Sequence, residues 1–297
     1  MIKIRKKEWS AVATRNMMLA PALLLIFVLA AYPLLYNLYI SFFNLNMITG
    51  ERELVGLQNY INVFTSREFF NSLRVTFRFV VFSLAIQVPL GVLIALLLNQ
   101  EFYGRWILRS LILMPWTVPT LVNATLWDWI YNVHYGALNR LLLQFNIIDS
   151  PIVWFANTDR ALAMVVLADT WRMLPLYVLM FLASLQTIPA TQMEAATIDG
   201  AGALKRFFYV TIPLIKPMLM VVLVIRTMQA LRVFEIIFVL TRGGPANSTM
   251  VISYFIYTQS FSFMRFSFGS ALAMVVALLS VVIAVVYVKV LRSDDIY

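Results

Sequence analysis

The chain contains no cysteine and a single histidine, His134, among its 297 residues. Without cysteine there is no disulfide framework, no thiol chemistry and no thiolate metal site. His134 stands beside Tyr135 and Gly136 in an expected loop, where a lone histidine with no catalytic or metal-binding partner is interpreted as a surface residue. The sequence therefore predicts neither a bound metal nor a catalytic histidine.

Charged residues are also scarce. They make up 12% of the chain, whereas apolar residues make up 62%, and the mean hydropathy is +0.84. This composition excludes a soluble globular domain and indicates an all-α integral membrane protein. In a soluble protein the formal net charge of +9 would suggest nucleic acid, but here basic residues only need to stand in loops beside the bilayer. We therefore expect membrane lipid as a partner, and no nucleic acid.

Nucleotide-binding and nucleophile motifs are missing too. The phosphate-loop pattern occurs nowhere among the ten glycines, and there is no dinucleotide fingerprint, paired-histidine zinc helix or serine-nucleophile elbow. The chain is therefore not expected to be an enzyme or to hydrolyse nucleotide by the phosphate-loop route. A membrane enzyme would need a convergent nucleophile or metal cluster that the sequence does not contain.

Long apolar runs, in contrast, are abundant. Six are long enough to cross about 30 Å of hydrocarbon. They cover residues 17–40, 75–99, 107–131, 161–185, 214–240 and 269–291. The first run is too long for a signal-peptide core and no clear cleavage site follows it, so we expect a retained helix. The expected organisation is a basic amino terminus (1–16), the first span, an external segment with an interfacial helix (41–70), a transmembrane core (71–291) and a tail (292–297).

The lysines orient these spans. All of them lie at the amino terminus, in the loop over residues 186–213, or at adjoining helix ends; they are Lys3, Lys6, Lys7, Lys205, Lys216 and Lys289. The positive-inside rule makes that side cytoplasmic. Arginine is less polarised, so the orientation depends mainly on lysine. Both termini and the 186–213 loop are therefore predicted to be cytoplasmic.

The loop between the fourth and fifth spans has a pattern of its own. Thr191 and Glu194 are spaced as a capping box, which predicts that a helix starts there. Gly200 and Gly202 can adopt the left-handed or open conformations that end a helix or turn it sharply. Pro213 then opens the next apolar run. The pattern predicts a compact helix-turn-helix at the membrane surface.

Polar residues inside the expected spans are the candidates for a translocation pathway, because a charge near the bilayer centre costs about 2.5 to 3.5 kcal/mol. In the fifth span Arg226, Gln229 and Arg232 recur every three residues and share one arc of the helix. Packing is the alternative for this arc, with Arg232 paired to Glu235. The other pathway candidates lie in the third and fourth spans and are Asn123, Trp171 and Tyr177.

Three further patterns concern the same spans. Asp169 and Arg172 are spaced to neutralise each other within the fourth span. Pro115 and Pro119 predict a bent third span that lines a cavity. The aromatic residues at the outer end of that span are interpreted as interface anchors rather than as sugar-stacking residues; they are Trp127, Trp129 and Tyr131.

An ordered series of motifs resembles one family. Glu194-Ala195-Ala196, Gly200 and Pro213 fit the cytoplasmic signature of the permease subunits of bacterial ATP-binding cassette (ABC) importers, with conservative departures at Val210 and Ile212. Flanking matches are Gly56-Leu57-Gln58-Asn59-Tyr60, Leu113-Met114-Pro115-Trp116, the run from Leu182 to Pro189, and Thr241-Arg242-Gly243-Gly244-Pro245. Over most of its length the chain is similar to the carbohydrate-uptake branch, which is related to maltose, lactose and glycerol-3-phosphate systems.

This resemblance implies the type I ABC importer transmembrane fold, with six transmembrane helices and both termini cytoplasmic, in the bacterial cytoplasmic (inner) membrane. It implies that the helix near Thr191 docks on a separate ATPase subunit. The implied coupling residues are Glu194, Ala195, Ala196, Asp199, Gly200, Ala201 and Pro213. The external loop containing Gly243, Gly244 and Pro245 would lie near an extracytoplasmic solute-binding protein.

The resemblance also implies a division of labour among subunits. This chain would bind no cofactor, whereas ATP and Mg would be bound by two partner ATPase subunits. A second, homologous permease would complete the pathway for a sugar, an oligosaccharide or a polyol. The alternative is an ion- or proton-coupled secondary transporter of a small polar solute, in which Asp169, Arg226 or Glu235 carries ions. That alternative predicts transport by this chain alone, driven by an ion gradient.

Overall fold

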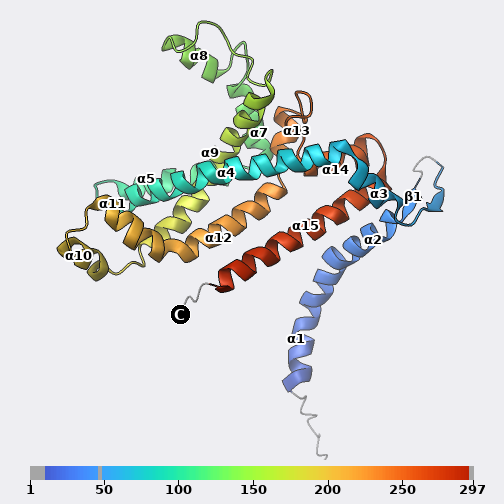
Figure 1. Ribbon diagram of the computed structural model, residues 1–297, viewed down its shortest axis with the longest axis horizontal. Helices are drawn as coiled ribbons and strands as arrows, with labels where there is room; N and C mark the ends of the chain where they lie inside the picture. Colours follow the sequence, from blue (N-terminus) through green and yellow to red (C-terminus); the bar gives the residue numbers. More distant parts are fainter. Residues whose placement is uncertain (1–10, 46–48, 294–297) are drawn as a thin grey trace, which may run out of the picture. The chain divides into compact units, whose positions relative to one another are not determined.

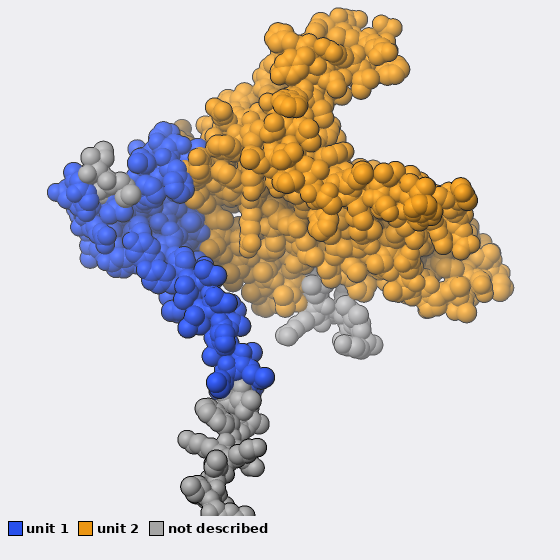
Figure 2. Space-filling view, turned by 180° about the vertical axis from the view of Figure 1, so that it is seen from behind, with its two compact units in different colours: residues 1–65, 258–275 blue, residues 66–257, 276–297 orange. Residues whose placement is uncertain are grey.

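The computed structural model describes residues 11–45 and 49–293. They are mostly helical (Figure 1) and belong to two compact units: Met1–Thr65 with Thr258–Val275, and Ser66–Tyr257 with Val276–Tyr297 (Figure 2). Most of the expected basic amino terminus, with its lysines Lys3, Lys6 and Lys7, lies outside the described residues, as does most of the expected tail.

The first unit contains the amino-terminal span. It is built from α1 (Ala11–Ile26), the π-helical turn η1 (Phe27–Ala31) and α2 (Tyr32–Ser41). Residues Arg15–Ser41 are long and apolar enough to cross a membrane. In η1 the amide of Tyr32 donates to the carbonyl of Phe27, five residues back. Because the following Pro33 has no N–H, the helix widens by one residue here instead of breaking.

A short hairpin and an amphipathic helix follow in the same unit. They are β1 (Phe43–Leu45), β2 (Arg52–Leu54), which is antiparallel to β1, and α3 (Gln58–Thr65). Asn59 of α3 is buried and donates to the carbonyls of Ser41 and Phe43, which fixes the helix against the end of α2. Ile61 and Phe64 remain exposed, as expected for a helix at the membrane interface.

The second unit holds the other long helices. They are α4 (Arg67–Asn99), α9 (Thr158–Leu185), the continuous helix formed by α11 (Ala203–Arg206), η2 (Phe207–Thr211) and α12 (Ile212–Leu231), and most of α15 (Phe266–Ser293). α4 and α9 run side by side in the same direction, and α12 packs against both. Gly91 permits the close approach of α4 to α9, because a Cβ atom there would lie 3.2 Å from the ring of Phe181.

The third expected span is broken. It consists of α5 (Arg105–Leu111), α6 (Met114–Thr117) and α7 (Thr120–Ile130), with a bend of 96° before α7. Val118 is extended because the ring of Pro119 disfavours a helical residue before it. The predicted bend is thus confirmed. The described residues contain five unbroken helices able to cross a membrane, or up to six if this bent pair is one span.

The fifth span begins and ends earlier than residues 214–240. The helix starts at Ala203 and passes through Pro213, because the amide of Ile212 donates to Phe207 and makes a π-helical turn before the proline. It ends at Leu231, whose carbonyl accepts a hydrogen bond from the hydroxyl of Ser253. Residues Glu235–Leu240 form a separate helix, α13, which packs against α7.

Two apolar clusters fill the second unit. One surrounds the beginnings of α4 and α9, and the other surrounds their ends. Tyr131 belongs to the first cluster, where it is 2% exposed and donates its hydroxyl to the carbonyl of Met164. Its interpretation as an interface anchor is therefore wrong, because a deep aromatic cluster covers the ring; Trp129 is the exposed member of that group.

Candidate functional site

The loop between α9 and α11 contains a short helix, α10 (Ala190–Ile198). Pro189 occupies the N-cap position, and no side-chain hydrogen bond caps the helix. The predicted capping box is therefore wrong: the helix starts one residue before Thr191, so the backbone of that threonine is already helical and its hydroxyl cannot serve as the cap.

The end of α10 has a well-defined left-handed turn. Gly200 has a φ of +76°, as the sequence analysis expected. Its amide donates to the carbonyl of Thr197, and the amide of Ala201 donates to the carbonyl of Ala196. These two bonds form a Schellman motif, which ends the helix and reverses the chain. Gly202 is extended and is the N-cap of α11.

A side-chain hydrogen bond joins α10 to the long helix that follows. Arg206 Nη1 donates to Thr197 Oγ1 at 2.7 Å, and that hydroxyl donates to the carbonyl of Met193. This exposed bond links α10 to the helix Ala203–Leu231, which leads back into the bundle.

The surface of this loop combines carboxylates with unusually exposed apolar side chains. Glu194, Ala195 and Asp199 are exposed, while Ala196 and Ala201 are half-buried and Pro213 is exposed on the first turn of α12. The most exposed apolar residues are Ile198 at 86%, Leu204 at 75% and Tyr209 at 81%. Large exposed apolar side chains beside charged residues in a polar loop are typical of a surface that contacts another protein. Figure 1 shows α10 at the ends of α9 and α12.

A layer of polar side chains lies between the two apolar clusters. Asp169 Oδ2 accepts hydrogen bonds from Arg226 Nη2 at 2.5 Å and from Gln87 Nε2 at 3.2 Å. Gln87 Nε2 also donates to Thr170 Oγ1. All four side chains are buried, and they come from α4, α9 and α12. The predicted pairing of Asp169 with Arg172 is wrong, because the buried Arg226 of the neighbouring helix satisfies the carboxylate instead.

The arc of Arg226, Gln229 and Arg232 divides into two parts. The guanidinium of Arg226 lies 5.6 Å from the ring centre of Phe79, and Gln229 accepts a hydrogen bond from the hydroxyl of Tyr177. Both residues thus pack α12 against its neighbours. Arg232 lies beyond the end of α12 and is exposed, and the ion pairs within the described ranges do not include one between it and Glu235.

The remaining pathway candidates do not share one open cavity. Asn123 is buried in α7 and donates to the carbonyl of Ala168, whereas Trp171 is 41% exposed and contacts the edge of Trp127. Gln87 was not among the residues predicted from the sequence. Its signature was available, because Gln87 is the one carboxamide among the charge-free residues 79–98.

The loop after α13 is held by several side chains. Gly243 is buried with a φ of +83°, and a Cβ atom there would lie 2.6 Å from Met250 Cε. Thr249 Oγ1 lies within hydrogen-bond distance of the Gly244 carbonyl, and Pro245 follows. Asn71 of α4 donates to the carbonyl of Asn247, which attaches the loop to α4.

The chain continues from this loop through α14 (Ile252–Tyr257) and a π-helical turn, η3 (Thr258–Ser262). The amide of Ile252 donates to Thr76 Oγ1, a second attachment to α4. Burial raises the pKa of Tyr254 and Arg242 partly opposes this shift, so the phenol stays neutral at physiological pH. Near α7, α8 (Ala137–Gln144) forms the only helix of the loop between α7 and α9 within the described residues.

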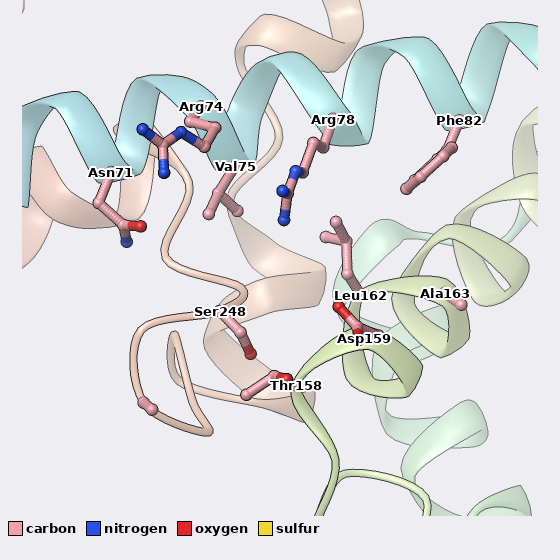
Figure 3. Close-up of a pocket in the computed structure, with 11 residues that line it drawn as sticks. Asn71, Arg74, Val75, Arg78, Phe82, Thr158, Asp159, Leu162, Ala163 and Ser248 are labelled. Atoms are coloured by element: carbon pink, nitrogen blue, oxygen red, sulfur yellow. The ribbon is translucent and has the colours of Figure 1, made fainter.

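A pocket of about 610 Å³ opens where the beginnings of α4 and α9 meet the loop after α13. Figure 3 shows Arg78 pointing into it from α4 and Arg74 lining it beside the helix, with Thr158 and Ser248 on the opposite side. Within the residues that the structure describes, no group of three or more His, Asp or Glu side chains is placed to hold a metal ion.

Comparison with known proteins agrees with this architecture. Residues 87–292 match the family described as binding-protein-dependent transport system inner membrane component. The trehalose/maltose transport system permease protein MalF of Thermococcus litoralis is 38% identical over 93% of this chain and 92% of its own length. The sulfoquinovosyl glycerol transport system permease protein SmoG of Agrobacterium fabrum is 36% identical over 94% of this chain and 90% of its own.

The fold matches a solved transporter as well. A crystal structure of a bacterial ABC transporter involved in the import of the acidic polysaccharide alginate superposes with a TM-score of 0.82. The match has 21% sequence identity and covers 95% of this chain and 97% of the other. The predicted all-α importer fold is thus confirmed, as is a multi-pass location in the inner membrane. The chain belongs to the binding-protein-dependent transport system inner membrane components, the permease subunits of ABC transporters.

Proposed function

We propose that this chain pairs with a second permease to form the pathway for a sugar, an oligosaccharide or a polyol, and couples that pathway to ATP hydrolysis by separate ATPase subunits. The observation that carries the coupling proposal is the exposed helix α10, which ends at Gly200 in a left-handed turn and presents Glu194 and Ile198. The carbohydrate class is supported by the names of the trehalose/maltose and sulfoquinovosyl glycerol permeases to which the chain is similar.

The proposed coupling route starts at the surface. Glu194 faces a basic group of the ATPase, and Ile198 enters an apolar cleft on it. Displacement of α10 then passes through the bond from Arg206 to Thr197 into the continuous helix Ala203–Leu231. That helix carries Arg226, which is bonded to Asp169 of α9. The ATPase therefore moves α12 and α9 together, and the pathway alternates between two states of access.

The orientation of the chain is part of this proposal. α10 and both termini lie in the cytoplasm, because the lysines gather there. The Gly243-Gly244-Pro245 loop then lies on the external side, where a solute-binding protein delivers cargo. In this arrangement the chain binds no cofactor itself, and ATP and Mg are bound by the ATPase subunits.

Reconstitution tests the proposed function. Proteoliposomes would contain this chain, its co-purified permease and ATPase partners, and the binding protein encoded with them. Uptake of radiolabelled maltose or trehalose is expected only with ATP inside and binding protein outside. The control is this chain alone under a proton or sodium gradient. Uptake under the control conditions would contradict the proposal and favour the ion-coupled alternative.

A further inference from the structure

The pocket at the beginnings of α4 and α9 has two cationic side chains that the proposed transport function does not use. Arg74 and Arg78 are one helical turn apart and both line the pocket, with Arg78 extending from α4 toward the opposite wall (Figure 3). Neither guanidinium has an ion-pair or hydrogen-bond partner among the interactions that the described residues make. Two unpaired guanidinium groups at this spacing form a site for an anionic group with several acceptor oxygens.

The position of the two arginines along α4 identifies the environment of the pocket. Residues 79–99 contain no charged side chain and are helical, so they rise about 31 Å along the helix axis. This length matches the hydrocarbon thickness of about 30 Å. Arg78 directly precedes the charge-free stretch, and Arg74 lies about 6 Å further out. Both guanidinium groups therefore lie at the depth of lipid headgroups.

The opposite wall offers hydroxyl groups. Thr158 and Ser248 face the two arginines across the pocket (Figure 3). Ser248 Oγ is shielded from solvent and has no hydrogen-bond partner. A buried hydroxyl without a partner is costly, so a ligand oxygen at this position would satisfy it. The amide of Asn71 is already used by the loop carbonyl of Asn247.

The side of the pocket toward the charge-free stretch is apolar. It is formed by Phe82, Leu162 and Ala163, and Phe82 is 49% exposed. A ligand that is anionic at one end and apolar at the other matches both walls. Asp159 also lines the pocket, and it is not ion-paired with either arginine in the described part of the chain. Its carboxylate is placed to accept a cationic group of the same ligand.

From these observations we propose that the pocket binds the headgroup of a glycerophospholipid. The phosphate accepts hydrogen bonds from Arg74, Arg78 and Ser248, the acyl chains descend along Phe82, and Asp159 favours headgroups that carry an amine. The pocket would thereby attach the loop after α13 to the membrane surface. This lipid site is separate from α10, and its test measures lipid binding directly, so its failure would leave the proposed transport function untouched.

Native mass spectrometry of the full chain, with the subunits that co-purify in nonionic detergent, tests the proposal. The probes are dioleoylphosphatidylethanolamine, dioleoylglycerol, which lacks the phosphate, and inorganic phosphate. The variant Arg74→Gln/Arg78→Gln is compared with Arg67→Gln/Arg160→Gln. This control removes the same charge from exposed positions of α4 and α9 that do not line the pocket.

We expect wild-type protein to bind the phospholipid and not the diacylglycerol. The pocket variant should bind it about tenfold more weakly, while the control variant binds as wild type. Arg74→Lys/Arg78→Lys, which keeps the charge, should recover part of the affinity. Asp159→Asn should reduce the preference for phosphatidylethanolamine over phosphatidylglycerol.

Four outcomes would overturn the proposal. Equal loss of lipid binding in the pocket and control variants would indicate a nonspecific charge effect. Displacement of the phospholipid by millimolar inorganic phosphate would indicate a free-anion site, and diacylglycerol binding as tightly as the phospholipid would show that the phosphate is not recognised. Loss of affinity for the solute-binding protein in the pocket variant, with lipid binding unchanged, would show that the pocket receives an acidic side chain of that protein.

Discussion

Asp169 and Arg226 form an ion pair that is almost completely removed from water. Burying either charge alone would cost several kcal/mol, and the pair is tolerated because each charge neutralises the other and Gln87 adds a hydrogen bond. The oxygen of Gln87, the oxygen of Asn123 and Nε of Arg226 remain without partners. The layer therefore contains one ion pair and the hydrogen bonds of Gln87, and three of its buried polar atoms have no hydrogen-bond partner.

Removal of one charge should be far more damaging than removal of both. Asp169→Asn leaves Arg226 buried and unpaired, and we expect a loss of about 3 to 5 kcal/mol of stability. The double variant Asp169→Asn/Arg226→Met should recover most of that loss. Thermal unfolding in detergent measures both, with Asp128→Asn on an exposed position of α7 as control. A single variant as stable as wild type would contradict the buried pair.

The left-handed turn at Gly200 depends on backbone conformation rather than on space. No atom lies within 4 Å of a Cβ added there, so the cost of a side chain comes from its φ of +76°. Gly200→Val should destabilise the turn by about 1 to 2 kcal/mol, whereas Gly200→Asn should be tolerated. Hydrogen exchange at the amide of Ala201 measures the turn.

Gly202→Val is the matched control for this pair, because Gly202 has a negative φ and open space around it. Its substitution should leave exchange at Ala201 close to wild type. Equal protection in Gly200→Val and Gly200→Asn would show that the left-handed conformation does not hold the end of α10.

Gly200 and Asp169 differ in how far their structural roles could be predicted from the sequence. Gly200 was predictable, since a left-handed helix end is a local requirement that glycine meets. The partner of Asp169 was not predictable from spacing. Arg172 is near in sequence, but Arg226 is 57 residues away and becomes a neighbour only once α9 and α12 pack.

At the scale of elements, the helix Ala203–Leu231 is the main departure from expectation. Pro213 suggested a helix start, because proline is favoured in the first turn. The helix instead continues through Pro213 and Pro217, with a π-helical turn before the first proline. A local proline rule could not predict this, since α12, which follows the irregularity, is stabilised by packing against α4 and α9, segments distant in the sequence.

The bond between Arg206 and Thr197 should control the mobility of α10. Arg206→Gln removes a solvent-exposed hydrogen bond, worth about 0.5 to 1.5 kcal/mol. We expect faster hydrogen exchange throughout α10 and unchanged exchange in α9. Lys205→Gln, an exposed neighbour that loses the same charge, is the control. Equal exchange in the two variants would exclude Arg206 as the attachment of α10.

For the whole molecule, composition and the length of the apolar runs were sufficient to predict the membrane location and the all-α fold. The order of the motifs was sufficient to predict the permease family. The interior was less predictable: Tyr131 and Trp154 belong to a packed cluster, although aromatic residues near helix ends usually mark the interface. Such residues are placed by contacts between distant segments, which no single stretch of sequence specifies.

The proposed function requires α10 to receive energy from a separate ATPase subunit. Because the chain has no cysteine, a thiol reagent can react with this chain only at the introduced cysteine of a single-cysteine variant. Ile198→Cys on α10 is compared with Ile147→Cys, an exposed apolar position between α8 and α9. The measurement is cross-linking to the ATPase subunits in intact membranes with a short bifunctional thiol-to-amine reagent. We expect a cross-link from position 198 that changes with ATP, and none from position 147. Absence of a cross-link at 198, or equal cross-linking at both positions, would contradict the proposed function.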